Sequence, residues 1–337
     1  MLKIIKNRKL YYYISGAFTI LALLFIFTFK LNLGIDMTGG TQTEYTYSKL
    51  DVEQVRLSVE EIKKGSTFSG VEIINNIDVY KVTGENKIAV VAGFDSSVND
   101  TELENLKVDF KNKVLKKLKE VDSTVLETLY ISIGKSFGDY IKNTAISTMI
   151  ITVLGIAIYL ARAFSGILTG WSIILSFSSI VILSLFHDVI VAVGFYVFTS
   201  NFLPDFKIDT LFVTALLTIL GYSINDTIVV FDRIRANLKL YSKKHKKDLD
   251  EIIDLSINET FARSLYTSFT VIIVLIAILF FGPETIKGFV LTMLYGTLIG
   301  TYSSIFIASP LLYDFNKGKA IELYEKKEYN ADDKIVV

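Results

Sequence analysis

Three ionisable side chains lie in or beside stretches of the sequence that are apolar enough to cross a lipid bilayer. They are Asp188, Asp226 and Arg263. An ionisable group in the hydrocarbon layer costs about 3 kcal/mol on insertion scales unless it is paired, protonated or facing a polar pathway. A chain that keeps such groups uses them to move an ion or to hold helices in register. These residues are therefore the first candidates for a functional site.

Asp226 and Arg263 could form a pair. Asp226 lies near the end of the apolar run 209–231, and Arg263 begins the run 263–281. Because consecutive spans are antiparallel, the two side chains should reach similar depths, where a carboxylate and a guanidinium can form a charge-assisted pair. If Asp226 binds and releases a proton, Arg263 would alternate between free and paired states, as in a gated relay. In the alternative interpretation, Asp226 is a helix-end charge and Arg263 is an anchor that reaches the membrane surface.

Asp188 lies well inside the run 171–198, near the middle of the membrane. At a rise of about 1.5 Å per residue, it should be roughly 10 Å from the depth of Asp226, so the two carboxylates should not touch. Asp188 is either a second protonatable group or an acceptor for Ser or Tyr hydroxyls. The side chain of its neighbour His187 points about 100° away around the helix, and we expect it to have a structural role.

Small and polar residues are concentrated in the same spans. They are Gly221, Ser223, Asn225, Thr227, Ser264, Thr267, Ser268 and Thr270. Such residues favour close helix approach and interhelical hydrogen bonds, and they could also line a hydrated path. The two interpretations do not exclude each other, and we include Asn225 with Asp226, Arg263 and Asp188 in the predicted relay.

The composition places the chain among integral membrane proteins. Of its 337 residues, 51% are hydrophobic, and the mean hydropathy is +0.46. The 35 basic and 35 acidic residues balance, so net charge favours no nucleic-acid partner. The lack of Cys excludes disulfides and thiolate chemistry, and two His argue against a metal centre. No nucleophile–base pair or cofactor loop emerges, so we expect no enzyme, no cofactor and no metal.

Six apolar runs are long enough to cross about 30 Å of hydrocarbon. They cover approximately 10–29, 142–162, 171–198, 209–231, 263–281 and 287–313. The first is longer than a signal-peptide core and lacks a cleavage site, so we expect it to be retained. Basic residues at the run ends predict cytoplasmic N- and C-termini.

The spans divide the chain into four parts. We expect a cytoplasmic arm and first helix in 1–30, an extracytoplasmic domain in 31–138, five further helices in 139–315 and a cytoplasmic tail in 316–337. The charged but periodic segment 235–259 predicts an amphipathic helix on the membrane face.

The soluble insert after the first span predicts a small α+β domain. Its periodicity indicates strands at 43–48, 71–82, 87–92 and 125–131, with helices beginning at Asp51 and near Asn99. This β-α-β-β-α-β order is the ferredoxin-like arrangement.

A glycine-containing segment connects the first span to this domain. It starts at Gly34 and continues through Asp36 to the pair Gly39 and Gly40. It lacks the glycine spacing and the lysine of a phosphate-binding loop. We predict a tight turn from helix to strand, in which Asp36 and Thr38 satisfy free backbone donors.

Taken together, these segments resemble the SecF family of the RND superfamily. The resemblance covers nearly the whole chain, and its most specific part is the Gly-Tyr-Ser-Ile-Asn-Asp motif that starts at Gly221. The other matching stretches are Leu33–Thr41, His187–Val189, Ala262–Ser268 and the Gly282-Pro dipeptide.

The resemblance implies a six-helix RND-type bundle with one extracytoplasmic ferredoxin-like domain. Asp226 matches the family's carboxylate in the fourth span, and Arg263 matches its arginine in the fifth. The resemblance also implies a separate SecD partner and action with the SecYEG translocon, SecA and YajC. It implies that the complex uses the proton or sodium motive force to promote translocation of unfolded preproteins across the cytoplasmic (inner) membrane. Two alternatives remain, a small-molecule RND exporter subunit and a structural membrane adaptor.

Overall fold

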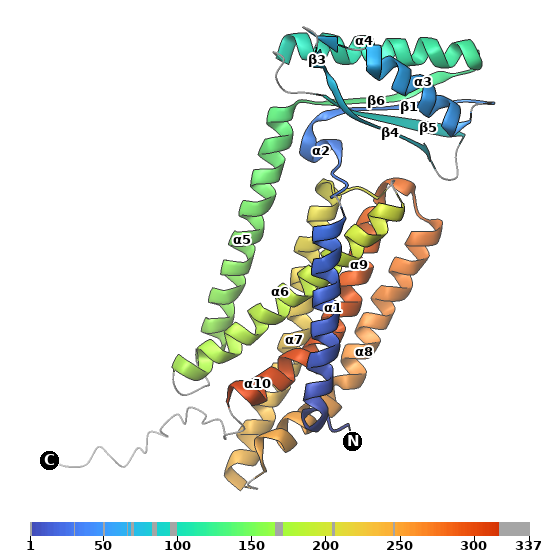
Figure 1. Ribbon diagram of the computed structural model, residues 1–337. Coiled ribbons are helices and arrows are strands. Elements are labelled where there is room, and N and C mark those ends of the chain that lie inside the picture. The colour runs from blue at the N-terminus through green and yellow to red at the C-terminus, as the bar shows by residue number, and fades with distance from the viewer. Residues whose placement is uncertain are drawn as a thin grey trace, which may run out of the picture.

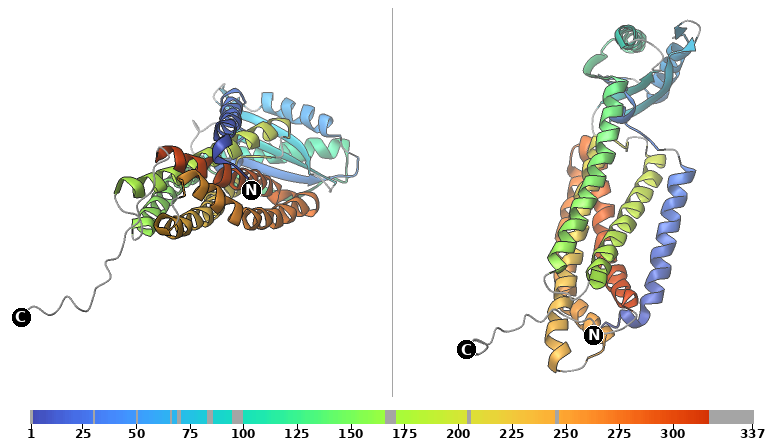
Figure 2. Two further views of the ribbon diagram at one scale, coloured as in Figure 1. Left: turned by 90° about the horizontal axis from the view of Figure 1, so that it is seen from below. Right: turned by 90° about the vertical axis from the view of Figure 1, so that its left-hand side faces the viewer.

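The molecule is a long helical bundle with an α+β domain at one end and the N-terminus at the other (Figure 1, Figure 2). The computed structural model describes residues 2–29, 31–49, 51–65, 67–68, 71–82, 86–94, 100–165, 171–203, 206–244 and 247–316. The predicted tail 316–337 lies outside these residues from position 317 onward. We call the two ends of the bundle the domain end and the N-terminal end.

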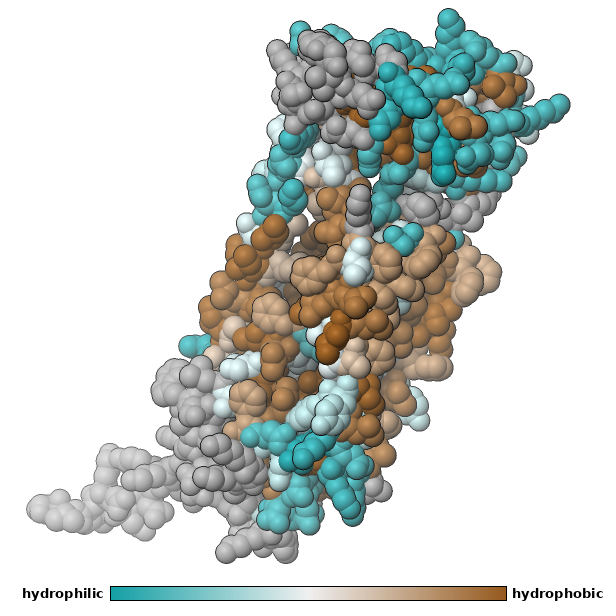
Figure 3. Space-filling model, viewed as in Figure 1, coloured by the Kyte–Doolittle hydropathy of each residue, from teal (hydrophilic) through white to brown (hydrophobic). Residues whose placement is uncertain are grey.

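Six helices in the described ranges are long and apolar enough to cross a membrane. The helices of the bundle are α1 (Arg8–Thr28), α5 (Lys135–Ser165), α6 (Trp171–Phe202), α7 (Thr210–Lys244), α8 (Leu249–Phe281) and α9 (Glu284–Ser303), the last continued by the π-helical turn η2 (Ser304–Ala308) and α10 (Ser309–Phe315). Apolar side chains cover the visible face of the bundle as a broad belt, whereas the α+β domain is largely hydrophilic (Figure 3). The predicted six-helix membrane fold is confirmed.

The α+β domain follows α1 and the short helix α2. Its elements are α2 (Ile35–Thr38), β1 (Gly40–Thr46), α3 (Val52–Gly65), β2 (Thr67–Phe68), β3 (Val71–Glu72), β4 (Ile74–Val82), β5 (Lys87–Phe94), α4 (Asp100–Val121) and β6 (Leu126–Ile133). The main sheet is antiparallel, with the strand order β4-β5-β1-β6. Strand β5 therefore lies between β1 and β4, although α3 connects β1 toward β4 in the sequence. This is the predicted split β-α-β arrangement, with β2 and β3 as an added small hairpin.

Both long helices of this domain lie on the face of the sheet that points away from the bundle (Figure 1). Their apolar stripes pack against alternate residues of the strands, and the shared core includes Tyr45, Val59, Val90, Phe110 and Leu118. The opposite face of the sheet points toward the domain end of the bundle. The domain is thus joined to the bundle through α1, α2 and α5.

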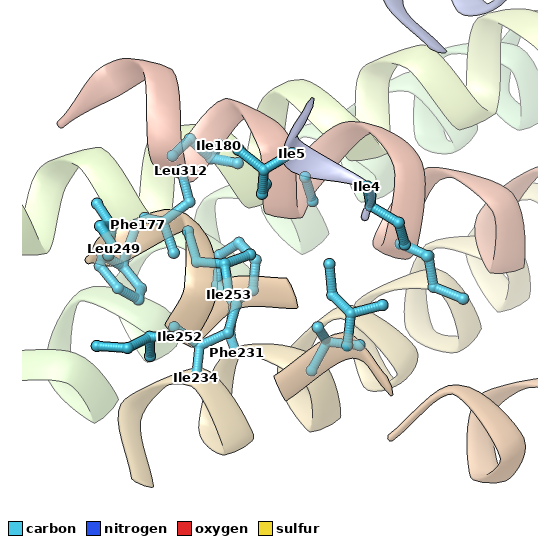
Figure 4. Packing of buried hydrophobic residues seen from close by; sticks show 14 of the residues in the cluster. Ile4, Ile5, Phe177, Ile180, Phe231, Ile234, Leu249, Ile252, Ile253 and Leu312 are labelled. Atoms are coloured by element: carbon cyan, nitrogen blue, oxygen red, sulfur yellow. The ribbon is translucent and has the colours of Figure 1, made fainter. Parts of the chain in front are cut away.

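The N-terminal end of the bundle has its own apolar core (Figure 4). Ile4 and Ile5, at the start of the 3-10 turn η1 (Ile5–Asn7), are almost fully buried in this core. Asp254 of α8 accepts hydrogen bonds from both of their backbone N–H groups, at 2.9 and 3.0 Å. The N-terminal arm is therefore an integral part of the bundle.

From its periodicity we predicted that the segment 235–259 forms a separate helix on the membrane face. The described residues of this segment do not form such a helix. Instead, α7 continues to Lys244 and α8 begins at Leu249, so the segment forms the two arms of a helical hairpin. Polar contacts join the arms, among them Arg233 to Glu259 at 2.6 Å. The apolar side chains of this segment pack into the core at the N-terminal end, so the protein itself buries them.

Candidate functional site

Asp226 lies on α7 in the interior of the bundle, with 8% of its surface exposed. Two serine hydroxyls donate hydrogen bonds to its carboxylate, Ser264 of α8 to one oxygen and Ser304 of η2 to the other. Three separate elements therefore meet at this carboxylate. Because each oxygen has a hydroxyl partner, the buried group is satisfied without an opposite charge.

Asp188 lies on α6 and is completely buried. One carboxylate oxygen accepts hydrogen bonds from Ser223 of α7 at 2.5 Å and from Ser303 of α9 at 2.7 Å. The other oxygen lies 2.9 Å from Nδ1 of His187. The acceptor role that we predicted as one alternative for Asp188 is therefore present, and the hydroxyls come from serines of two neighbouring helices.

The two carboxylates are linked through neighbouring residues of the sixth span. Ser303 donates to Asp188, and the next residue, Ser304, donates to Asp226. The π-helical turn η2 begins at Ser304, and Ser309 donates a hydrogen bond to its carbonyl at 3.0 Å. Such wide turns change the direction of side chains and are frequent at functional sites. Sequence reasoning missed both serines, although a Ser-Ser pair inside an apolar run was an available signal.

No ion pair joins Asp226 to Arg263 in the described part of the chain, so the predicted pairing is wrong. The depth estimate was correct, because Ser264, the neighbour of Arg263, contacts Asp226. Consecutive residues of a helix point about 100° apart, and Ser264 takes the inward position. Arg263 consequently lies on the exposed face of α8.

Asn225 and Gly221 also lie on an exposed face, that of α7. Asn225 precedes Asp226 and points away from it for the same geometric reason. A Cβ atom at Gly221 would meet nothing within 4 Å, so no helix approaches this glycine closely within the described structure. The structure therefore brings Asp226 and Asp188 into one polar network and leaves Asn225 and Arg263 outside it. Whether the four residues form a relay stays a prediction.

The glycine-containing segment forms the predicted turn, but its side chains act differently from our expectation. Gly39 and Gly40 both have positive φ angles, 74° and 137°. Thr38 donates its hydroxyl hydrogen to the carbonyl oxygen of Gly34 at 3.1 Å and so satisfies an acceptor. Asp36 does accept from a backbone N–H, but that group belongs to Thr210 at the start of α7. The segment therefore connects the domain to the bundle.

A metal centre is not formed by the described residues, which contain no group of three or more His, Cys, Asp or Glu side chains close enough to hold an ion. The described side chains around the two carboxylates are serine hydroxyls and, at Asp188, the His187 imidazole. Such a carboxyl group can be satisfied in its ionised or in its protonated form, because a hydroxyl can both donate and accept a hydrogen bond.

The fold and this network define a class, the multi-pass membrane proteins with six spans and a ferredoxin-like domain between the first two. The model of the SecD/SecF protein export membrane protein C-terminal family matches residues 113–318, and the SecD/SecF GG motif matches residues 24–49. The chain belongs to the SecD/SecF family.

Relatives and solved structures agree with this assignment. The protein translocase subunit SecF of Sebaldella termitidis is 35% identical over all of this chain and 99% of that protein. The protein translocase subunit SecDF of Bacillus subtilis is 32% identical over 90% of this chain, which spans 37% of it. The crystal structure of SecDF, a translocon-associated membrane protein from Thermus thermophilus, matches 94% of this chain with a TM-score of 0.73 and 26% identity. This chain spans 39% of that structure.

Proposed function

We propose that this chain is a SecF-type subunit of a protein translocase, which pairs with a separate SecD-type chain and uses the proton or sodium motive force to promote translocation of unfolded preproteins. The step takes place after or alongside the work of SecYEG and SecA, with YajC as a further partner, and includes no enzymatic reaction by this chain. The coupling part of the proposal depends on one observation, the carboxylate of Asp226 held inside the bundle by two hydroxyls.

The hydroxyl partners suit a group that changes its ionisation or its bound ion. Ser264 and Ser304 contact the two carboxyl oxygens of Asp226, and both hydroxyls can donate to its ionised form. A serine oxygen can instead accept a hydrogen bond from a protonated carboxyl group, so either state can be satisfied by rotating a hydroxyl. One charge that crosses the whole membrane field supplies about 2.3 kcal/mol per 100 mV. That free energy shifts a two-state equilibrium roughly 50-fold.

A polar stripe on the outside of the bundle supports a SecD-type partner. Thr214, Thr218, Gly221 and Asn225 recur every three or four residues on the exposed face of α7, and Arg263 is exposed on the neighbouring α8. Polar and small residues of this kind are typical of helix–helix interfaces in membranes. SecDF proteins, in which the two parts form one chain, are among the relatives. In our proposal the partner bundle covers this stripe and receives Arg263.

The distribution of basic residues supports an orientation in the cytoplasmic membrane. Arg8 begins α1, Arg162 lies in the last turn of α5, and Arg233 and Arg235 lie in the second half of α7; these parts of the helices lie toward the N-terminal end of the bundle. At the domain end, Lys207 precedes α7 and Lys287 lies in the first turn of α9. Cytoplasmic ends of spans are enriched in Lys and Arg. We therefore propose that the N-terminal end faces the cytoplasm and that the α+β domain is extracytoplasmic.

The test replaces Asp226 by Asn, which keeps the shape of the side chain and removes its charge and its exchangeable ion. The full chain is reconstituted with its SecD partner and SecYEG in vesicles, and preprotein release is measured with and without an ion gradient. We expect Asp226→Asn to abolish the gradient-dependent part of the release while the complex still assembles.

Asp232→Asn is the matched control. This residue lies on the same helix, about two turns further on, and its exposed carboxylate pairs only with Arg235 in the described structure. The control should retain full stimulation. Undiminished stimulation in Asp226→Asn would refute the coupling role and favour the adaptor alternative, in which the buried carboxylates only fix the helices.

A further inference from the structure

The Gly39–Gly40 segment is wedged between the α+β domain and the start of α5. A Cβ atom at Gly40 would lie 2.4 Å from the carbonyl oxygen of Ala92 in β5, and one at Gly39 would lie 2.9 Å from Cα of Lys135 in α5. Both positive φ angles disfavour residues with a side chain. The short helix α2, which precedes this pair, is therefore held in a fixed position relative to the domain.

The carboxylate of Asp36 in α2 reaches from the domain to the first residue of α7. Its Oδ2 accepts a hydrogen bond from Oγ1 of Thr210 at 2.7 Å and a longer one from the Thr210 backbone N–H at 3.4 Å. The first N–H groups of a helix have no partner inside the helix, and a negative charge is favourable there. Asp209, the residue directly before α7, caps the same helix end by accepting a hydrogen bond from the N–H of Phe212 at 2.8 Å.

The residues just before α7, together with its first residue, make further contacts with the same domain and its connection to α1. We call residues 206–210 the lead-in segment. Ile208 forms a parallel bridge with Leu33, and its backbone N–H and C=O bond to Asn32 at 2.7 Å and Gly34 at 2.9 Å.

Lys207 of the lead-in segment reaches the sheet itself. Its ammonium group lies 3.2 Å from a carboxylate oxygen of Asp78 in β4 and 5.4 Å from the ring centroid of Tyr80. Backbone, hydroxyl and ammonium groups of the lead-in segment thus all bind the α+β domain or the residues that connect this domain to α1.

We propose that Asp36 and the lead-in segment form a clasp through which the α+β domain sets the position of the domain end of α7. This helix is continuous and also carries Asp226, about four turns from Thr210. A change at the carboxylate can therefore reach the domain as a shift or tilt of α7, and a movement of the domain can reach the carboxylate. Asp36 and Thr210 are positioning residues in this proposal. A crevice of about 270 Å³ beside the clasp, lined by Asp36, Tyr80, Lys207 and Asp209 among others, leaves space for such a movement.

The consequence for export rests on the proposed function, but the clasp can be tested without it. Thr210→Val removes the hydroxyl and keeps the shape, whereas Thr210→Ser keeps the hydroxyl. Thr28→Val at the end of α1 is the control, because its hydroxyl bonds only to the carbonyl oxygen of Leu24 in its own helix in the described structure. All variants are measured as full chains, in lipid and together with the SecD partner.

Two readouts report on the clasp directly. The natural chain contains no Cys, so spin labels at Leu57→Cys in the domain and Phe281→Cys at the end of α8 are unique, and both positions are exposed. We expect Thr210→Val to broaden the label-to-label distance distribution and to accelerate amide hydrogen exchange at residues 210–213 roughly tenfold, the effect of losing a hydrogen bond to a charged group. Thr210→Ser and Thr28→Val should match the natural chain in both readouts.

The clasp proposal fails if Thr210→Val gives the same distances and exchange rates as the natural chain, or if Thr210→Ser loses as much as Thr210→Val. Release assays separate the two proposals. If the natural complex shows no gradient-dependent release, the proposed function fails, while the distance distributions still decide the clasp. If stimulation is present, Thr210→Val should reduce it and Thr210→Ser should retain it.

Discussion

At the scale of single residues, the most informative feature is the way two neighbouring serines serve two different carboxylates. Ser303 binds Asp188 and Ser304 binds Asp226, so α9 and η2 connect helices α6, α7 and α8 at one level of the bundle. A change in the ionisation or ion occupancy of Asp188 alters the hydrogen bonding of Ser303, and a change at Asp226 alters that of Ser304. These two serines are adjacent in the sequence. The two sites are therefore suited to influence each other.

A second carboxylate, Asp122, gives a pH prediction for the α+β domain. Hydrogen bonds from the hydroxyl and N–H of Thr124 and from the N–H groups of Ser48 and Lys49 hold the pKa of Asp122 well below its usual range. A depressed folded-state pKa stabilises the fold above the unfolded value of about 3.9 and loses that stabilisation as the pH falls through the folded value.

We therefore expect Asp122→Ala to lower the unfolding temperature of the domain at pH 7 and to do so less and less as the pH falls below about 4. Thermal unfolding of the full chain, followed by hydrogen exchange in β1 and β6, measures the effect. Asp109→Ala, which removes only an exposed ion pair with Lys113, should cost little at either pH. Equal losses for Asp122→Ala at neutral and strongly acidic pH would contradict the assignment.

Residue counting predicted the depth of the site but not the direction of its side chains. The sequence was sufficient to bring Asp226 and the start of the fifth span to one level, because helical rise is constant. It was not sufficient to choose between Arg263 and Ser264 as the inward residue, because charge attraction and burial favour opposite choices. In the described chain, the smaller hydroxyl side chain takes the inward position.

At the scale of elements, α1 and α6 pack closely at Gly194. A Cβ atom at Gly194 would lie 2.4 Å from Cβ of Ala22 and 2.7 Å from its carbonyl oxygen, so the backbones approach each other directly. Gly194→Ala should therefore push the two helices apart and destabilise the protein by about 1–3 kcal/mol.

The control is Gly155→Ala in α5, where a Cβ atom would meet nothing within 4 Å. This change should be neutral or slightly stabilising, by up to about 1 kcal/mol, because Ala has the higher helix propensity. Thermal unfolding in detergent distinguishes the two variants. A similar unfolding temperature for both would show that the α1–α6 contact tolerates an added methyl group.

Elements with a strong periodic signal were predictable, and those that depend on tertiary contacts were not. The spans and the β-α-β-β-α-β order follow from apolar run length and alternation. The hairpin of α7 and α8 was mistaken for a surface helix, because an amphipathic stripe fits lipid and a protein core equally well. The π-helical turn η2 was not anticipated.

At the scale of the whole molecule, the bundle resembles one part of a larger assembly. The polar stripe of α7 and the exposed Arg263 of α8 lie on the outside, and α5 contacts few other helices, mainly α6. The SecDF structure, in which the matching region makes up 39% of the chain, provides the context that we propose for these surfaces. The carboxylate network is complete within this chain, whereas its access to ions is expected to depend on the partner.

Infrared difference spectroscopy tests the central claim most directly, namely that Asp226 binds the coupling ion. The complete complex with its SecD partner, in lipid, is compared before and after addition of protons or sodium ions, for the natural chain and for Asp226→Asn. We predict a carboxyl or carboxylate band that changes on ion addition in the natural chain and is lost in Asp226→Asn, but is retained in Asp232→Asn. Identical difference spectra for the natural chain and Asp226→Asn would contradict the account.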